Sequence, residues 1–343
     1  MFFAKDFIET AEGLIFAVVE QGLEDGKVLC FLRYVLMSSG WNKVATEQAN
    51  NLLQQQYPDY LHYSPILDAH LHAVDVDRIV KHHQPKHRLQ QVMQSDRHDI
   101  ARDGVYAASQ SGTGAAIARD GVYAASLPGA GAAVVERDLF RLCELFEQHD
   151  LDLAQTGVTG SILIGVQNQA SDIDLVCYGR EVFHQCRAIT RELIELGQLQ
   201  TLNGRDWRQS YDRRSCDLSF DDYVWHEQRK CNKAVINGRK FDLSFIDDGA
   251  SPEAVNYRKC GAITLQCKVI DDFHAFDYPA EFKIDHQQIG SIVSFTATYI
   301  GQAIRGEMVE VSGVLEQSEQ GVKRIVVGSS REAHGEYIKV IQC

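Results

Sequence analysis

Two aspartates stand two residues apart in a strand-like segment near the middle of the chain. Residues 171–176 read SDIDLV. Side chains alternate along a strand, so Asp172 and Asp174 share one face while Ile173 and Leu175 turn into the core. Two carboxylates held side by side repel each other unless a cation lies between them. Mg2+ prefers oxygen ligands and normally brings substrate phosphates with it, so the spacing predicts a magnesium site for a phosphate-bearing substrate.

Two further stretches carry groups that such a site needs. Gly160-Ser161 ends a short apolar run, and backbone N–H groups at the start of a short helix over residues 161–166 are suited to bind phosphate. A third carboxylate should lie on a neighbouring strand. The segment GRKFDLSFID, residues 238–247, places Asp242 on the polar face of a strand whose other face is apolar. We therefore expect this carboxylate to lie beside the first two.

The Gly-Ser turn, the spacer, the Asp-x-Asp pair and the later strand carboxylate together resemble the DNA polymerase beta-like nucleotidyltransferase superfamily. The resemblance covers residues 134–250. The flanking segments, with DFIET, GLIFAV and VLCFLRYV near the N-terminus, resemble uncharacterised microbial proteins that carry such a domain. Taken alone, SDIDL is also compatible with an ordinary strand start and a capping aspartate.

The resemblance implies transfer of a nucleoside monophosphate from an NTP, with ATP among the candidates, to an acceptor hydroxyl, with release of pyrophosphate. It implies two Mg2+ ions, with Mn2+ as a substitute, bound by Asp172, Asp174 and Asp242. Asp242 would also serve as general base, and Gly160 and Ser161 would hold the β- and γ-phosphates. The acceptor stays open between a tRNA-sized RNA, a protein hydroxyl and a small molecule.

Three cations precede the strand of Asp242. Arg229 and Lys233 are four residues apart, on or near one helix with Lys230, and they could meet the triphosphate or an acidic substrate. The alternative is a solvated helix face on which they pair with nearby acidic residues. The sequence alone is compatible with both interpretations.

The chain is predicted to be an α/β (α+β) multidomain protein in four parts. Residues 1–95 form an N-terminal α+β domain, and residues 96–133 hold a 17-residue Gly/Ala-rich tandem repeat, interpreted as an insertion or linker. Residues 134–250 form the nucleotidyltransferase domain. Residues 251–343, with five short strand patterns, form a small OB-like β-barrel.

Local patterns predict the elements around the site. We expect a hairpin within residues 2–19, a strand over 27–36, a helix from Thr46 to before Pro58, and a helix from Asp75 to about His83. Amphipathic helices are expected over 134–150 and 181–196. Five histidines, at positions 70, 72, 82, 83 and 87, could form a metal site, but surface histidines are the favoured interpretation.

Composition narrows the class of protein. The net charge of −13 argues against a broad grip on polynucleotide, although a local basic patch stays open. Nine scattered cysteines suggest reduced thiols in a cytoplasmic protein, and we expect no signal peptide and no membrane-spanning segment. The alternatives to an enzyme are a non-catalytic nucleotide- or nucleic-acid-binding module and a structural partner that uses its C-terminal barrel. The oligomeric state stays open.

Overall fold

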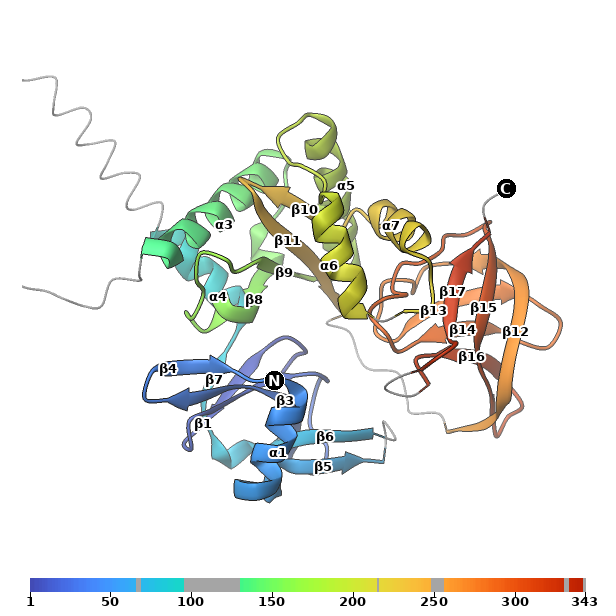
Figure 1. Cartoon of the computed structure of the whole chain (residues 1–343), viewed down its shortest axis with the longest axis horizontal. Helices are drawn as coiled ribbons and strands as arrows, with labels where there is room; N and C mark the ends of the chain where they lie inside the picture. Colours follow the sequence, from blue (N-terminus) through green and yellow to red (C-terminus); the bar gives the residue numbers. More distant parts are fainter. Residues whose placement is uncertain (66–68, 96–129, 215, 248–255, 330–332, 342–343) are drawn as a thin grey trace, which may run out of the picture. The chain divides into compact units, whose positions relative to one another are not determined.

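The computed structural model describes residues 1–65, 69–95, 130–214, 216–247, 256–329 and 333–341 (Figure 1). The chain divides into two compact units. The first joins Met1–Ile189 to Val235–Asp248, and the second joins Thr190–Ala234 to Gly249–Cys343. Both units combine helices with strands, so the protein is mixed α and β with several sheets, as the sequence predicts.

A seven-stranded antiparallel sheet forms the N-terminal part of the first unit. Its order is β5-β6-β3-β2-β1-β7, with β4 paired to one end of β3. The strands are β1 (Phe7–Thr10), β2 (Leu14–Val18), β3 (Lys27–Met37), β4 (Gly40–Lys43), β5 (Leu61–Ser64), β6 (Ala69–Asp75) and β7 (Ile79–His83). The predicted hairpin is confirmed as the β1–β2 pair, and β3 is the predicted third strand.

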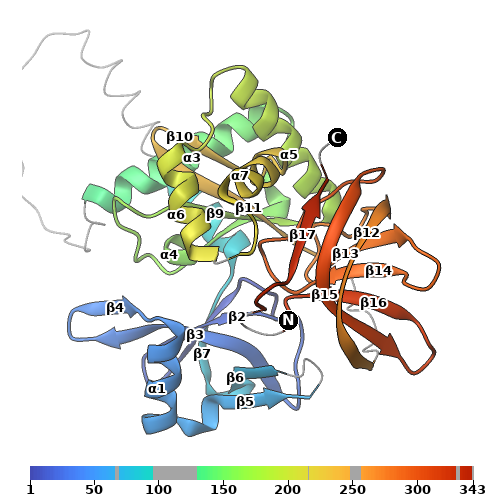
Figure 2. The same cartoon turned by 45° about the vertical axis from the view of Figure 1, so that its right-hand side comes forward.

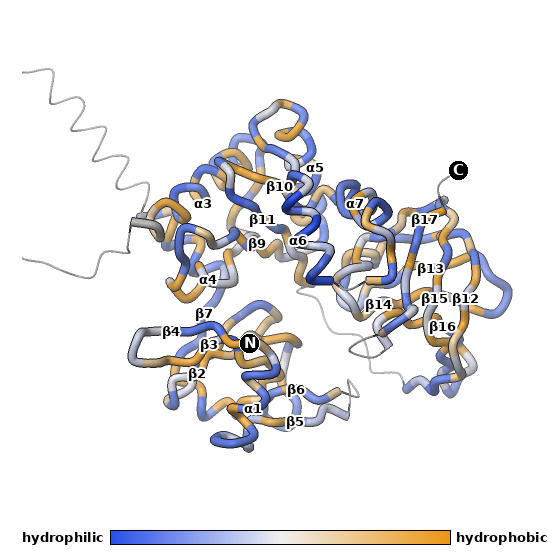
Figure 3. The backbone as a smooth tube through the Cα atoms, in the orientation of Figure 1, coloured by the Kyte–Doolittle hydropathy of each residue, from blue (hydrophilic) through white to orange (hydrophobic). Residues whose placement is uncertain are grey.

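One helix covers the apolar face of this sheet. Helix α1 (Thr46–Gln56) lies where the sequence predicts it, and a 3-10 turn, η1 (Pro58–Tyr60), follows it. Figure 2 shows α1 beside β3. Ala49 and Leu53 of α1 are fully buried and pack with Phe16 and Leu32 of the strands. Figure 3 shows the apolar stretches of these strands in orange. The burial of these side chains is the main source of stability for this layer.

The segment after Asp75 differs from the predicted helix. Residues Val76–Arg78 form a single 3-10 turn, η2, and β7 then pairs antiparallel with β1. Pairing with the edge of β1 satisfies backbone groups that a short amphipathic helix would leave to solvent, and this tertiary contact overrides the weak helical pattern. A helix begins later and covers residues 85–95.

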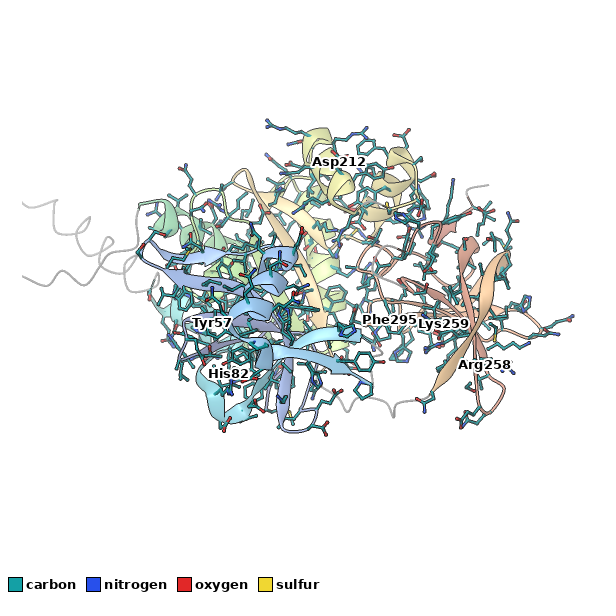
Figure 4. All side chains as sticks on the ribbon, turned by 60° about the horizontal axis from the view of Figure 1, so that its bottom comes forward. Tyr57, His82, Asp212, Arg258, Lys259 and Phe295 are labelled. Atoms are coloured by element: carbon teal, nitrogen blue, oxygen red, sulfur yellow. The ribbon has the colours of Figure 1, made fainter. Side chains whose placement is uncertain are left out.

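The histidines of this sheet have ordinary structural partners. Nε2 of His82 lies 2.7 Å from Oδ2 of Asp6, and Nε2 of His83 lies 3.2 Å from Oε2 of Glu9; Figure 4 labels His82 on the sheet. The ring of His72 is buried and accepts a hydrogen bond from the N–H of Leu32. The favoured interpretation of surface histidines is therefore wrong for His72, which is buried, and His82 and His83 lie in strand β7 rather than at a helix end.

The second sheet of the first unit carries the candidate site. Its order is β10-β11-β9-β8, from strands β8 (Thr156–Thr159), β9 (Ile173–Tyr178), β10 (Lys233–Ile236) and β11 (Arg239–Ile246). Helices α3 (Ala130–Gln148) and α5 (Arg180–Glu195) pack on one face (Figure 1), where Phe146 meets Phe241 and Phe183 meets Phe245. The predicted amphipathic helices are thus both confirmed. A 3-10 turn, η3 (Leu153–Gln155), precedes β8.

Helix α3 begins four residues before the predicted boundary at residue 134. Residues 130–133, the end of the second repeat copy, therefore belong to its first turn. The remainder of the repeat, residues 96–129, lies outside the described residues.

The described part of the second unit holds the end of α5, two complete helices and a six-stranded sheet. The helices are α6 (Gly204–Arg214) and α7 (Phe220–Arg229). The sheet order is β12-β13-β14-β16-β15-β17, and β12 also pairs with β15. Its strands are β12 (Tyr257–Asp271), β13 (Ala280–Asp285), β14 (Ser291–Ser294), β15 (Met308–Ser318), β16 (Lys323–Val327) and β17 (Tyr337–Val340).

The five predicted C-terminal strands are present, and β13 is a sixth that the sequence analysis missed. Its sequence AEFKID alternates buried Ala280, Phe282 and Ile284 with more exposed charged residues, so the signal for a strand was there. The OB-like barrel stays a prediction. In the described part of the chain, no helix is long and apolar enough to cross a membrane.

Candidate functional site

The predicted carboxylates lie on adjacent strands of the β8–β11 sheet. Strands β9 and β11 run parallel, and their register places Asp242 directly beside Asp174. Ile173 and Leu175 are buried on the opposite face, as the alternation predicts. Asp172 lies one position before β9, with a side chain that is 45% exposed, and Nζ of Lys240 is 3.8 Å from its Oδ2. All three carboxylates therefore belong to the same side of one sheet.

The Gly-Ser turn meets the central carboxylate. Thr159, at the end of β8, pairs with Asp174 of β9 in antiparallel register. Gly160 follows with φ of +69°, and a Cβ placed on it would lie 2.4 Å from Oδ2 of Asp174. Only glycine avoids both the left-handed strain and this collision. The helix expected over residues 161–166 is a single turn, α4 (Gly160–Leu163), which bends back through a bond from the N–H of Val166 to the carbonyl of Ser161.

Asp174 is held in an environment that opposes its negative charge. Burial and the neighbouring Asp242 carboxylate raise the pKa of Asp174 to about 6, and Asp172 adds to this effect. The positive charges of Lys5 and Lys43, both from the N-terminal sheet region, act in the other direction. A cation bound between Asp174 and Asp242 would relieve their repulsion.

The oxygen atoms of these side chains suit Mg2+, although they do not form a complete set of metal ligands. Over the residues that the structure describes, no three or more histidine, cysteine, aspartate or glutamate side chains form a ready metal site. Mg2+ in phosphate-transfer sites is usually held by one or two carboxylates, with substrate phosphates and water completing its shell. The pair Asp174 and Asp242, with Asp172 beside it, offers oxygen donors of that kind.

The N-terminal segment covers the face that bears these carboxylates. Val176 and Tyr178 continue the Asp174 face along β9, and Ile246 continues the Asp242 face along β11. These three residues form an apolar cluster against which Phe3 and Ala4 pack. The residue that follows is Lys5. The N-terminal segment thus closes one side of the candidate site, a contact that the sequence analysis did not predict.

Two residues of the N-terminal domain, Lys5 and Arg88, hold the Gly-Ser turn in place. Oγ1 of Thr159 donates to the carbonyl of Lys5 at 2.8 Å. Nε of Arg88, in the helix over residues 85–95, donates to the carbonyl of Ile162 at 2.9 Å. Arg88 also pairs with Glu136 of α3. These bonds position the turn beside Asp174 before any ligand binds.

The three predicted phosphate-binding cations lie in a different setting. Lys230 is 2% exposed, and both it and Lys233 pair with the buried carboxylate of Glu227, whose pKa they hold at about 2 although burial acts to raise it. Nζ of Lys230 also donates to the carbonyl of Thr298 at 2.8 Å. These contacts match the alternative of pairing with acidic neighbours, in a buried rather than a solvated form.

Arg229 is engaged in the same region. Its guanidinium pairs with Glu307 and stacks over the ring of Trp225, with 4.4 Å between Cζ and the ring centroid. Arg229 and Lys230 thus join α7 to the β-rich part of the second unit, and Lys233, the first residue of β10, pairs with Glu227 of α7. Each of the three cations already pairs with an acidic side chain, so none of them is assigned to phosphate binding.

A basic helix in the second unit had no place in the sequence analysis. Helix α6 has the sequence GRDWRQSYDRR, and Figure 3 shows it as hydrophilic. Arg205, Arg208, Arg213 and Arg214 are exposed. With four arginines against Asp206 and Asp212, α6 is locally basic in a chain with a net charge of −13, and the four arginines within eleven residues were the signal that could have found it.

Comparisons with known proteins place the chain next to a relative without assigned function. No protein-family model matches the chain, and no solved structure matches it. The chain is similar to an uncharacterised protein of Methanocaldococcus jannaschii, with 28% identity over 366 aligned residues and 98% of each chain covered. The similarity therefore extends over both units, and the polymerase beta-like core stays a prediction from the motif and its geometry.

Proposed function

We propose that this protein is a magnesium-dependent nucleotidyltransferase that moves a nucleoside monophosphate from an NTP to an acceptor hydroxyl. The observation that carries the proposal is the register of β9 and β11, which sets Asp242 beside Asp174, with the Gly160 turn against the same carboxylate.

Each residue has a distinct task in this proposal. Mg2+, when bound, would supply positive charge for the phosphate oxygens at which negative charge develops. Asp172, Asp174 and Asp242 would hold it, and Asp242, which is exposed, would accept the proton of the acceptor hydroxyl. The turn at Gly160 and Ser161 would lie along the β- and γ-phosphates, positioned by Thr159 and Arg88. Pre-positioned groups of this kind lower the barrier without reorganisation at the moment of reaction.

The competing function is a module that binds nucleotide or nucleic acid without turnover. The pKa of Asp174 argues for a cation at this site, because two adjacent carboxylates without one destabilise the fold. Tight NTP binding with no pyrophosphate release would favour the binding module instead.

The experiment is a thermal-shift titration with each of the four NTPs, with and without Mg2+. It is run on the wild type, on Asp172→Asn/Asp174→Asn and on Asp242→Asn, with pyrophosphate release measured in parallel. A ligand that binds only the folded state raises the melting temperature. A magnesium-dependent shift that the variants lose, together with pyrophosphate release that needs Asp242, would support the proposal. NTP-independent melting in the wild type would contradict it.

The exposed arginines of α6 bear on the acceptor. They are the charge pattern that a tRNA-sized RNA acceptor would need, and long-range phosphate attraction of this type weakens as salt is added. Replacing Arg205 and Arg208 by glutamine should lower RNA binding while NTP binding stays unchanged. Equal RNA binding by this variant would favour a protein or small-molecule acceptor.

A further inference from the structure

Lys5 is held in an unfavourable backbone conformation next to the candidate site. Its φ is +74°, in the left-handed region that non-glycine residues avoid. The turn around it is fixed by a bond from the N–H of Phe3 to Oδ2 of Asp6 at 3.0 Å and by a bond from the N–H of Lys5 to the carbonyl of Val18 at 3.0 Å. Such strain is kept only where surrounding contacts overdetermine it, and it is concentrated at functional sites.

The position of Lys5 is defined by its neighbours on both sides. Ala4 packs on the cluster of Val176, Tyr178 and Ile246, at the end of the face that carries Asp174. The carbonyl of Lys5 accepts a hydrogen bond from Thr159, the cross-strand neighbour of Asp174. The Lys5 residue is exposed, on a backbone that these contacts fix beside the site.

Lys43 approaches the same place from the β3–β4 hairpin. It pairs in register with Tyr34 of β3. Tyr34 packs with Leu163, the last residue of α4, and Trp41 of the hairpin packs on the same cluster. Lys43 itself is exposed. The hairpin therefore carries a second lysine to the side of the Gly-Ser turn.

We propose that Lys5 and Lys43 of the N-terminal domain bind the triphosphate chain of the nucleotide at the Asp174 site. This inference rests on the proposed nucleotidyltransferase function and adds a substrate-binding role for a domain outside the 134–250 core. Ammonium groups on flexible stems are common phosphate ligands. The carbonyl of Lys5 is bonded to Thr159, the cross-strand neighbour of Asp174, and the hairpin that carries Lys43 packs on Leu163 of the turn that follows Thr159. The α7 cations pair with Glu227 and Glu307.

The proposal makes the N-terminal domain part of the nucleotide site rather than a separate module. Lys5 and Lys43 of this domain would neutralise the negative charge of the phosphates, and the domain of residues 134–250 would supply the carboxylates. The lysines would bind the triphosphate before transfer and the pyrophosphate after it.

The test measures binding of inorganic tripolyphosphate and of ATP, each with Mg2+, by calorimetry on the full chain. The variants are Lys5→Gly, Lys43→Gln and the two combined. We expect each single change to weaken binding about ten-fold, the size of one charged contact, and the double change to weaken it more. Wild-type affinity should also fall more steeply with salt than that of the double variant.

The choice of glycine at position 5 and two control variants separate binding from folding. Lys5→Gly removes the side chain and relieves the left-handed strain, so a loss of binding in a variant at least as stable as wild type cannot come from unfolding. Lys81→Gln removes an exposed lysine from β7 of the same sheet and should leave binding unchanged. Lys43→Arg should retain most of the affinity that Lys43→Gln loses.

The outcomes distinguish this inference from the function on which it rests. Wild-type affinity for both ligands in the double variant, with pyrophosphate release still abolished by Asp242→Asn, would overturn the role of the lysines and leave the proposed function standing. A wild-type protein that binds neither tripolyphosphate nor any NTP would overturn both. A higher KM for NTP in the lysine variants, with kcat little changed, would support binding of the substrate phosphates.

Discussion

A Cβ on Gly160 would lie 2.4 Å from Oδ2 of Asp174. Gly160 lies in the turn after β8 and Asp174 lies in β9, so the turn and the carboxylate are packed against each other without room for a methyl group. The site is therefore defined by a backbone contact as well as by its charges.

Replacing Gly160 by alanine should displace Asp174 and abolish magnesium-dependent nucleotide binding. Gly165 provides a matched control, because its φ of +73° is nearly the same and a Cβ there would meet nothing within 4 Å. Both alanines should cost about 1–2 kcal/mol of unfolding free energy for the left-handed conformation. Only Gly160→Ala should also lose the NTP-dependent thermal shift. Loss of that shift in both variants would show that strain, rather than the contact with Asp174, is responsible.

Asp174→Asn should inactivate the protein and stabilise its ligand-free form. The pKa of this carboxyl is raised from 3.8 to about 6, so the unpaired charge lowers stability as pH rises from about 4 to above 6. The amide removes this effect, and we expect a gain of about 1–3 kcal/mol at pH 7 and little change at pH 4. Urea unfolding without Mg2+ measures it.

The control for this substitution is Asp212→Asn, an exposed aspartate on α6 that Figure 4 labels. It should change stability little at either pH. A destabilised Asp174→Asn variant at pH 7 would contradict the electrostatic account of the site. The same carboxylate must be ionised to bind a metal, so NTP-dependent pyrophosphate release should rise with pH through about 6.

Lys230→Met should destabilise the fold without weakening nucleotide binding in the folded protein. The substitution leaves the buried carboxylate of Glu227 with one ammonium instead of two, and the carbonyl of Thr298 loses its donor. Breaking a buried ion pair from one side costs about 3–5 kcal/mol. Denaturant unfolding gives the stability, and calorimetry with ATP below the melting temperature gives the affinity. A large loss of affinity with normal stability would instead return Lys230 to the nucleotide site.

Two buried histidines should make the protein sensitive to acid. Burial lowers the pKa of both His72 and His226 to about 4. Each neutral ring is used twice: His72 accepts from Leu32 N–H and donates to Asn50, while His226 accepts from Val340 N–H and donates to the Asp222 carbonyl.

Because the unfolded chain takes up these protons near pH 6.5, stability is complete above that pH and falls as pH drops towards 4. Each histidine accounts for up to about 3 kcal/mol of this loss. The unfolding free energy of the wild type should decrease between pH 7.5 and pH 5. The His72→Gln variant should have a lower unfolding free energy at pH 7.5 and a smaller decrease at pH 5. His87→Gln, an exposed substitution, serves as control and should follow the wild type. A pH-independent stability between these values would refute the prediction.

Much of the site could be predicted from the sequence, because its signals are local. The alternation in SDIDLV and in GRKFDLSFID places the aspartates on one strand face with apolar residues on the other. The glycine in the turn after β8 is likewise a local signal, because Gly160 has a positive φ that other residues rarely adopt. The amphipathic helices α3 and α5, the hairpin of β1 and β2, and helix α1 follow from the same kind of short-range pattern.

The tertiary structure decided which strands are neighbours and which charges are already engaged. The pairing of β11 with β9 joins residues almost 70 positions apart, and nothing in either segment alone specifies that register. Pairing with the edge of β1 makes residues 79–83 a strand, β7, where the sequence predicts a helix.

Packing also decides which cations are engaged. The residue types of Arg229, Lys230 and Lys233 suit a phosphate site, yet tertiary packing gives each of them an acidic partner. Lys5 and Lys43 lie far from the motif in sequence and reach it only because the N-terminal segment and the β3–β4 hairpin pack beside the Gly-Ser turn. Charge type and face are local properties of a sequence, whereas proximity comes from the burial of apolar surface between segments distant along the chain.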